Sequence, residues 1–182
     1  MRTKLFLAAL LLPLSLPVEA ALAPGAVAPD FSAAGAMAGK PLSVNLKAAL
    51  KKGPVVLYFF PAAFIGGCNV EAAAFAAALP DFTAAGATVI GMTAGNVDKL
   101  VAFSSEHCAG KFAVAAASPE VIRGYDVLLR KPDGTPTTIT SRTSYVIAPN
   151  GKILFAHTDM SPNDHIKMTL DVVRKYKAGK RS

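Results

Sequence analysis

Runs of apolar residues predict buried strands that alternate with helices along most of the chain. Residues 54–60 (PVVLYFF) are continuously apolar and rich in β-branched and aromatic side chains, which is typical of a strand buried on both faces. Residues 87–93 and the shorter run 112–117 predict two more strands. The predicted helices cover residues 70–79, 80–86, 96–106 and a short segment from Ser118, with Pro80 in a first turn and Asn96 as a cap.

The last third of the chain has the pattern of an antiparallel hairpin followed by a helix. Residues 135–140 alternate, residues 143–148 (TSYVIA) predict a strand, and Pro149-Asn150-Gly151 predicts a tight turn into a partner strand over 152–158. Residues 162–177 predict a terminal helix with Ile166, Leu170 and Val173 facing inward. This order of elements predicts an α/β fold in which a mixed central β-sheet is flanked by helices on both faces.

The first twenty residues have the pattern of a secretory signal peptide. Arg2 and Lys4 precede an almost wholly apolar stretch over 5–18, and Val18-Glu19-Ala20 carries small residues at the positions that a signal peptidase reads. We therefore expect a signal peptide over 1–20, one domain over 21–182, and a bacterial periplasmic or secreted location. In such a compartment a thiol pair tends toward the disulfide.

Composition and charge exclude several classes of function. The hydrophobic fraction of 52% includes 34 alanines, and no run after residue 20 approaches the roughly 20 apolar residues of a membrane span, so we expect no integral membrane association. The formal charge of +7 falls to about +1 over residues 21–173, because residues 1–20 carry a net +1 and a basic tail from about residue 174 holds five cations and no acid. Without a basic face or a recognition motif in the body, we expect no nucleic-acid binding.

Cys68 is the residue at which we expect chemistry. It follows the loop Pro61-Ala62-Ala63-Phe64-Ile65-Gly66-Gly67 after the first long buried strand, at or just before the N-terminus of a helix. Unpaired amides and the helix dipole stabilise a thiolate at such a position, so the sequence favours a reactive cysteine. On position alone, a buried free cysteine or half of a passive disulfide is the alternative.

The same segment resembles the active-site loop of the peroxiredoxins, especially the bacterioferritin-comigratory-protein (Q) subgroup. Their loop has the pattern Pro-x-x-x-Thr/Ser-x-x-Cys after an apolar strand, and Pro61 and Cys68 stand at this spacing. The likeness extends over roughly residues 24–175. It includes Ala28-Pro29-Asp30-Phe31, residues 85–93, Arg142-Thr143-Ser144-Tyr145-Val146-Ile147 and Pro149-Asn150-Gly151-Lys152-Ile153.

This resemblance implies a thioredoxin-like fold and the thiol-dependent reduction of hydrogen peroxide or organic hydroperoxides. Cys68 would be the peroxidatic cysteine, oxidised to a sulfenic acid, and Arg142 would hold the thiolate and polarise the peroxide. Pro61 would shield the sulfur, amides near Gly67 and Cys68 would bind the peroxide oxygens, and Glu71 would position the arginine. For Glu71, an ordinary acid in the first turn of the helix is an equal alternative.

Ile65 departs from the family pattern, because it stands where the family has a Thr or Ser hydroxyl. Loss of one preorganised donor in a dry site typically costs on the order of 10²–10³ in rate. The resemblance also implies that Cys108, just past a predicted helix, is a resolving cysteine that closes an internal disulfide with Cys68. The alternative function is a non-catalytic thioredoxin-fold redox sensor or binding module with a static Cys68–Cys108 disulfide, which Ile65 favours.

Other redox and metal chemistries fit the sequence less well. The three histidines are not at pair spacing and neither cysteine has a second ligand nearby, so we expect no metal and no cofactor. A thioredoxin-type C-x-x-C motif is missing, and the chain has no tryptophan for a site of the glutathione-peroxidase type. The expected partners are a peroxide and a thioredoxin-like or other thiol reductant, for a chain that is a monomer or a homodimer.

Overall fold

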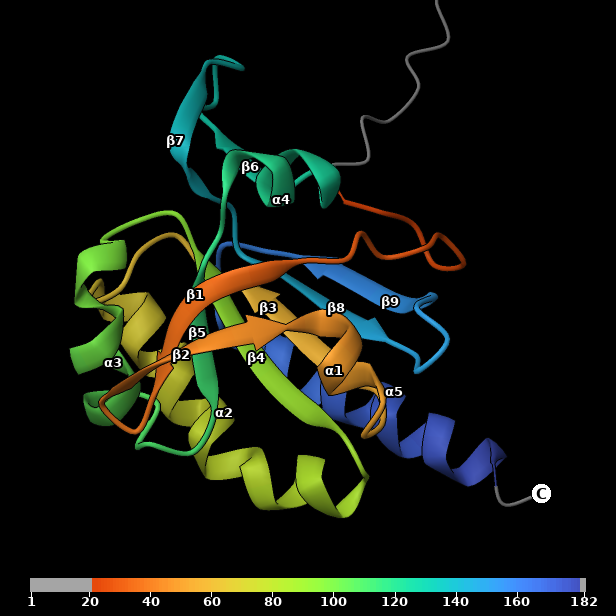
Figure 1. Ribbon diagram of the computed structural model, residues 1–182. Coiled ribbons are helices and arrows are strands. Elements are labelled where there is room, and N and C mark those ends of the chain that lie inside the picture. Colours follow the sequence, from red (N-terminus) through yellow and green to blue (C-terminus); the bar gives the residue numbers. More distant parts are fainter. Residues whose placement is uncertain (1–20, 181–182) are drawn as a thin grey trace, which may run out of the picture.

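A mixed seven-stranded sheet forms the centre of the fold (Figure 1). The computed structural model describes residues 21–180, so the signal peptide predicted over residues 1–20 lies outside the described residues. The sheet has the order β2-β1-β5-β4-β3-β8-β9, and a separate small sheet pairs β6 with β7. The strands are β1 (Ser32–Met37), β2 (Lys40–Asn45), β3 (Val55–Phe59), β4 (Thr88–Thr93), β5 (Ala113–Ala116), β6 (Leu128–Arg130), β7 (Pro136–Thr140), β8 (Thr143–Ile147) and β9 (Ile153–Thr158). The helices are α1 (Leu46–Leu50), α2 (Gly66–Ala84), the 3₁₀ turn η1 (Val97–Lys99), α3 (Leu100–Glu106), α4 (Pro119–Gly124) and α5 (His165–Gly179).

The pairing of β3 places its C-terminal end between two other strands in the middle of the sheet. β3 runs parallel to β4 and antiparallel to β8, with Phe59 opposite Met92 on one side and Thr143 on the other. The end of β3 therefore meets the end of β4 and the start of β8. β8 and β9 are antiparallel neighbours, so the hairpin predicted around residues 149–151 is confirmed.

Helices cover both faces of the sheet, as the order of elements predicts (Figure 1). Successive side chains of β3 point to opposite faces. Val56 and Tyr58 join a hydrophobic cluster with residues of α2, α3 and α5, whereas Leu57 and Phe59 join a second cluster with residues of α1 and α4. The five residues of β3 are all fully buried, which explains the continuous apolar run. Among residues 21–180, no helix is long and apolar enough to cross a membrane.

The predicted break in the helix at Pro80 is wrong, because α2 continues through this residue to Ala84. A proline inside a helix lacks the amide that would bind the carbonyl four residues earlier, which here is that of Ala76. The ammonium of Lys111 donates to this carbonyl at 3.1 Å. A lysine from the segment before β5 thus replaces the hydrogen bond that Pro80 removes.

The predicted cap at Asn96 is also wrong. Asn96 lies in the left-handed region (φ 54°), makes no side-chain cap and precedes the 3₁₀ turn η1, so the α-helical part of this segment is only α3. Its Nδ2 instead donates to the carbonyl of Ala63 at 2.8 Å, which ties this turn to the loop after β3. Leu100 and Phe103 of this segment are buried, but Val97 and Val101 are exposed.

The N-terminal hairpin β1–β2, helix α1 and strand β6 have no counterpart in the sequence prediction. β1 is rich in alanine and glycine and only one of its residues is fully buried, so no apolar run marks it. The terminal helix begins at His165, and the basic tail predicted from about residue 174 begins inside it. Arg174 pairs with Asp81 at 3.4 Å and Lys177 donates to the carbonyl of Ala84, so these cations bind the C-terminal end of α2, where a helix dipole favours them.

Candidate active site

The loop between β3 and α2 is held in place by the loop that follows β4. The hydroxyl of buried Thr93 donates to the carbonyl of Pro61 at 3.0 Å, and the amide of Ala63 donates to the carbonyl of Gly95 at 3.2 Å. A Cβ at Gly95 would lie 2.4 Å from the Pro61 carbonyl oxygen, so only glycine permits this approach. Phe64 has a positive φ of 63°, a strained conformation for a bulky residue, and its ring packs against that of Phe103.

Cys68 lies in the first turn of α2, as its third residue, and is 1% exposed. The sequence places it at or just before the helix start, so the structure moves it slightly into the helix. Its amide donates to the carbonyl of Ile65 at 2.8 Å. This amide is therefore engaged within the turn and is not presented to a ligand, contrary to the expectation for the Cys68 amide. Ile65 is the residue before the helix, and it provides no side-chain cap.

Arg142 reaches the same place from the strand next to β3. It directly precedes β8, whose first residue is paired with the last residue of β3. The side chain is buried, at 4% exposure. Its Nη2 donates to Sγ of Cys68 at 3.6 Å, and a Cβ on Gly67 would lie 3.3 Å from the same nitrogen. The structure thus brings together Cys68, Gly67 and Arg142 as the sequence predicts.

The guanidinium of Arg142 is fixed by two further acceptors. Nη1 donates to Oε2 of Glu71, and Nε donates to the carbonyl of Met160 at 2.9 Å. Three nitrogens of the planar group therefore have three different partners, an arrangement that a lysine cannot reproduce. A cation held in this way beside a sulfur stabilises negative charge on it and on an attacked peroxide.

Glu71 is a buried partner of the arginine and not an acid of the first helical turn. It is the sixth residue of α2 and is fully buried. Burial raises the pKa of its carboxyl to about 7, although the charge and hydrogen bond of Arg142 pull in the opposite direction. Its second oxygen, Oε1, has no hydrogen-bond partner. The positioning alternative for Glu71 therefore fits the geometry, and the first-turn alternative is wrong.

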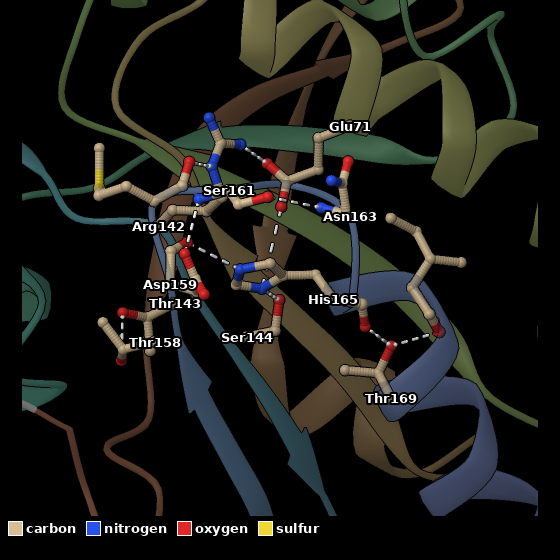
Figure 2. A network of polar contacts seen from close by, with 12 residues as sticks. Glu71, Arg142, Thr143, Ser144, Thr158, Asp159, Ser161, Asn163, His165 and Thr169 are labelled. Carbon is tan, nitrogen blue, oxygen red and sulfur yellow. Dashed lines mark hydrogen bonds and ion pairs between the residues drawn. The ribbon is translucent and has the colours of Figure 1, made fainter.

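A polar cluster behind Glu71 was not predicted from the sequence (Figure 2). His165, fully buried at the start of α5, has Nδ1 at 4.0 Å from Oε1 of Glu71 and 2.8 Å from the hydroxyl of Ser144. Its Nε2 lies 2.9 Å from the carbonyl of Asp159. Helical spacing could have indicated its burial. His165 precedes Thr169 by four residues and Val173 by eight, so all three lie on the buried face of the terminal helix.

Cys108 lies just past α3 and is fully buried in the same hydrophobic cluster as Cys68. Both cysteines are free thiols in this structure. Burial raises the pKa of the Cys108 thiol to about 12, so this residue stays protonated in its present position. Of the other predicted residues, Pro61 is buried at the start of the loop, and Ile65 is 48% exposed.

Comparisons with known proteins agree with this geometry. Residues 24–156 match the model of the AhpC/TSA family. A chloroplastic peroxiredoxin Q from Sedum lineare is 31% identical over 144 residues, covering 76% of this chain and 72% of that protein, and one from Arabidopsis thaliana is 32% identical over 155 residues, covering 82% and 66%. The crystal structure of peroxidoxin BcpB from Mycobacterium tuberculosis is similar with a TM-score of 0.72 at 25% identity, covering 84% of this chain and 96% of that one.

The sheet with helices on both faces and the buried Cys68–Arg142 pair define a thioredoxin-like thiol protein, so the predicted fold class is confirmed. The chain belongs to the AhpC/TSA family, and it is a thiol-dependent peroxidase of the peroxiredoxin type, similar to the bacterioferritin-comigratory-protein and peroxiredoxin Q group. The predicted family and enzyme class are therefore confirmed.

Proposed function

We propose that Cys68 is the peroxidatic cysteine of this peroxidase and that Arg142 activates it. The observation that carries the proposal is the hydrogen bond from Nη2 of Arg142 to Sγ of Cys68, at 3.6 Å inside a buried site. Glu71 and the carbonyl of Met160 hold the guanidinium in this position. A fixed cation at this distance stabilises the charge that develops on the peroxide as the sulfur attacks it.

The first step is an attack of the Cys68 thiolate on one oxygen of a hydroperoxide. A sulfur–oxygen bond forms and the oxygen–oxygen bond breaks, so the sulfur is oxidised to a sulfenic acid and the peroxide is reduced. The departing oxygen leaves as hydroxide or alkoxide and takes a proton from solvent, which gives water or an alcohol. Arg142 stabilises the charge on this oxygen before the proton arrives.

Cys108 is the proposed resolving cysteine. Its sulfur attacks the sulfenic acid, a Cys68–Cys108 disulfide forms and water leaves. Since both thiols are buried and Cys108 is protonated there, this step requires the first turn of α2 and the segment after α3 to open. Ala109 and Gly110, both with positive φ, form a local turn just after Cys108. A thioredoxin-like or other thiol reductant then reduces the disulfide.

The remaining predicted residues shape the entrance to Cys68. Pro61 is buried at the start of the loop that holds the cysteine, and it limits access of water to the sulfur. Gly67 leaves room for the guanidinium, because any side chain there would press against Nη2 of Arg142. Ile65 contributes an exposed apolar wall where the resembling proteins have a hydroxyl. We expect slower turnover than a threonine at this position would allow.

Export to the periplasm, or secretion, is the proposed location. The pattern of residues 1–20 supports it, with a positive start, an apolar stretch and small residues before position 21. Expression of the full chain in a bacterium with a periplasm tests this proposal. A mature protein that starts at Ala21 in the periplasmic fraction is the expected result, and an uncleaved cytoplasmic protein contradicts it.

Single-turnover oxidation tests the assignment of the two cysteines. The reduced protein is mixed with hydrogen peroxide or an organic hydroperoxide, and oxidation and free thiols are followed over time. Wild type is expected to lose both thiols quickly, Cys68→Ser to lose the fast phase, and Cys108→Ser to keep the fast phase but stop at the sulfenic acid. A static disulfide module is indicated instead if the reduced Cys68 reacts no faster than a free thiol in solution.

A further inference from the structure

A chain of hydrogen bonds leads from His165 to the arginine of the peroxidase site (Figure 2). It runs through the turn that follows β9. Nε2 of His165 contacts the carbonyl of Asp159 at 2.9 Å, the amide of Asp159 donates to the carbonyl of Arg142 at 3.2 Å, and the next carbonyl, that of Met160, accepts from Nε of Arg142 at 2.9 Å. The imidazole thus supports the short segment that binds both the backbone and the guanidinium of Arg142.

Glu71 lies next to both Arg142 and His165. Oε2 of this carboxylate accepts from Arg142, and Oε1 faces Nδ1 of His165 at 4.0 Å. Oε1 is buried and has no hydrogen-bond partner, so this contact makes His165 a near neighbour of the arginine's partner and is not a hydrogen bond.

The tautomer of His165 follows from its partners. A carbonyl oxygen only accepts, so Nε2 carries the proton toward Asp159, and Nδ1 accepts from the hydroxyl of Ser144. Burial lowers the pKa of His165 to about 4, so the ring is neutral near neutral pH. The titratable groups around it are Glu71 from α2, Arg142 before β8, His157 from β9 and Asp159 after β9.

We propose that His165 is a positioning residue of the peroxidase site, which holds the Arg142 guanidinium against Cys68 through the Asp159–Met160 turn. The proposal rests on the proposed function of Cys68 and extends it to a residue that touches neither the sulfur nor the peroxide. Ser144 contributes to the same positioning, because its hydroxyl binds Nδ1 and fixes the orientation of the imidazole ring.

The test compares His165→Leu with His165→Gln and with Val173→Ala in single-turnover oxidation by hydrogen peroxide. Leucine removes both polar edges, and we expect the rate of Cys68 oxidation to fall roughly 10- to 100-fold, as a displaced catalytic group does. Glutamine keeps an N–H donor for the Asp159 carbonyl and is expected to restore most of the rate. Val173, buried on the same helix, is the control for lost stability without lost polarity.

A second readout separates positioning from general destabilisation. The ultraviolet absorbance of the thiolate at neutral pH is expected to fall in His165→Leu and to stay unchanged in Val173→Ala. The proposal is overturned if His165→Leu oxidises as fast as wild type. It is also overturned if the oxidation rate falls no further in His165→Leu than in Val173→Ala when the two variants have similar unfolding midpoints. If His165→Leu does not fold, Ser144→Ala decides: a lower rate supports the proposal and an unchanged rate overturns it. A wild-type Cys68 that fails to react contradicts the proposed function itself.

Discussion

Nη2 of Arg142 lies 3.6 Å from Sγ of Cys68, although 74 positions separate the two residues in the chain. The sheet creates this proximity, because β8 starts where β3 ends and α2 begins just beyond the same edge. The reactive sulfur thus comes from the helix that follows β3, and its cation comes from the start of the neighbouring strand.

Replacement of Arg142 tests the geometry of the cation as well as its charge. Arg142→Lys keeps the charge but cannot reach Cys68, Glu71 and the Met160 carbonyl at once. We expect the second-order rate of Cys68 oxidation to fall on the order of 10²-fold. Arg123→Lys, at an exposed site on α4, is the matched control and should react as wild type does. Equal rates in Arg142→Lys and wild type would show that the three simultaneous contacts of the guanidinium are not required.

Ile65→Thr is expected to raise both the rate and the stability. Ile65 is the residue before α2, has extended backbone angles and makes no side-chain cap, and a threonine there can accept from an amide of the first turn. Such a cap contributes about 0.5–2 kcal/mol to the free energy of unfolding. The same hydroxyl is placed next to the turn that carries Cys68. Ile65→Val is the control without a hydroxyl, and equal rates and unfolding midpoints for the two variants would contradict this prediction.

The stability of the protein is expected to change little with pH between about 4.5 and 6.5, because Glu71 and His165 compensate. Burial raises the pKa of Glu71 from 4.5 to about 7, so the folded state binds the extra proton and stability falls as the pH rises through this window. Burial lowers the pKa of His165 from 6.5 to about 4, so stability rises with pH over nearly the same window. Within this window the folded state carries the titrating proton on Glu71 and the unfolded state carries it on His165, so both states bind one proton.

Single substitutions of the pair should reveal the two opposing slopes. In Glu71→Gln the free energy of unfolding is expected to rise with pH from about 4 to 6.5, and in His165→Gln to fall with pH from about 4.5 to 7. The largest slope for one proton is about 1.4 kcal/mol per pH unit. Urea unfolding at several pH values measures both slopes. Parallel pH profiles for wild type and both variants would contradict the compensation.

The hydrogen bond from Lys111 to Ala76 should depend on Pro80. Lys111→Met is expected to cost about 1 kcal/mol of unfolding free energy, because the Ala76 carbonyl then lacks a donor. In the background of Pro80→Ala, where an amide is again available to this carbonyl, the same substitution should cost much less. Lys131→Met at an exposed loop position is the control. A double-mutant cycle from thermal or urea unfolding measures this coupling, and strict additivity would contradict the account.

Tyr58→Phe is expected to stabilise the protein. The hydroxyl of Tyr58 is buried without a hydrogen-bond partner, while its ring stacks on Phe75 with centroids 4.4 Å apart. Its removal relieves a desolvation cost of about 1–3 kcal/mol and keeps the stacking. Tyr125→Phe is the matched control, since the hydroxyl of Tyr125 donates to the carbonyl of Pro29 at 2.7 Å and its loss should destabilise. A lower unfolding midpoint for Tyr58→Phe would show that its hydroxyl has a partner.

The sequence predicted the central elements because their local pattern agrees with their burial. The run of β3 is apolar because both its faces are covered, and the Pro149-Asn150-Gly151 turn has the residues that a hairpin needs. The helix through Pro80 could not be predicted in this way. The helix continues because Lys111, 31 positions after Pro80, donates to the carbonyl that Pro80 leaves free, and no local sequence pattern indicates this contact.

The residues of the candidate site likewise differ in whether a local sequence pattern marks them. Cys68, Arg142 and Glu71 were found because a loop–helix junction and a resemblance to a known family mark them. His165 and Ser144 were missed, because a lone histidine at a helix start and a serine in a buried strand have no pattern of their own. Only the crossing of α5 over β8 brings them behind Glu71 (Figure 2).

The central claim is that Cys68 is the peroxidatic thiol, and trapping of its sulfenic acid tests it most directly. The reduced Cys108→Ser variant is mixed with one equivalent of hydrogen peroxide in the presence of a cyclic dione that captures sulfenic acids, and the labelled peptide is identified by mass spectrometry. The account predicts one adduct, on Cys68, whose rate of formation falls strongly when Arg142 is also replaced by lysine. Absence of an adduct on Cys68 while peroxide is still consumed, or an adduct that forms at the same rate with lysine at position 142, would contradict it.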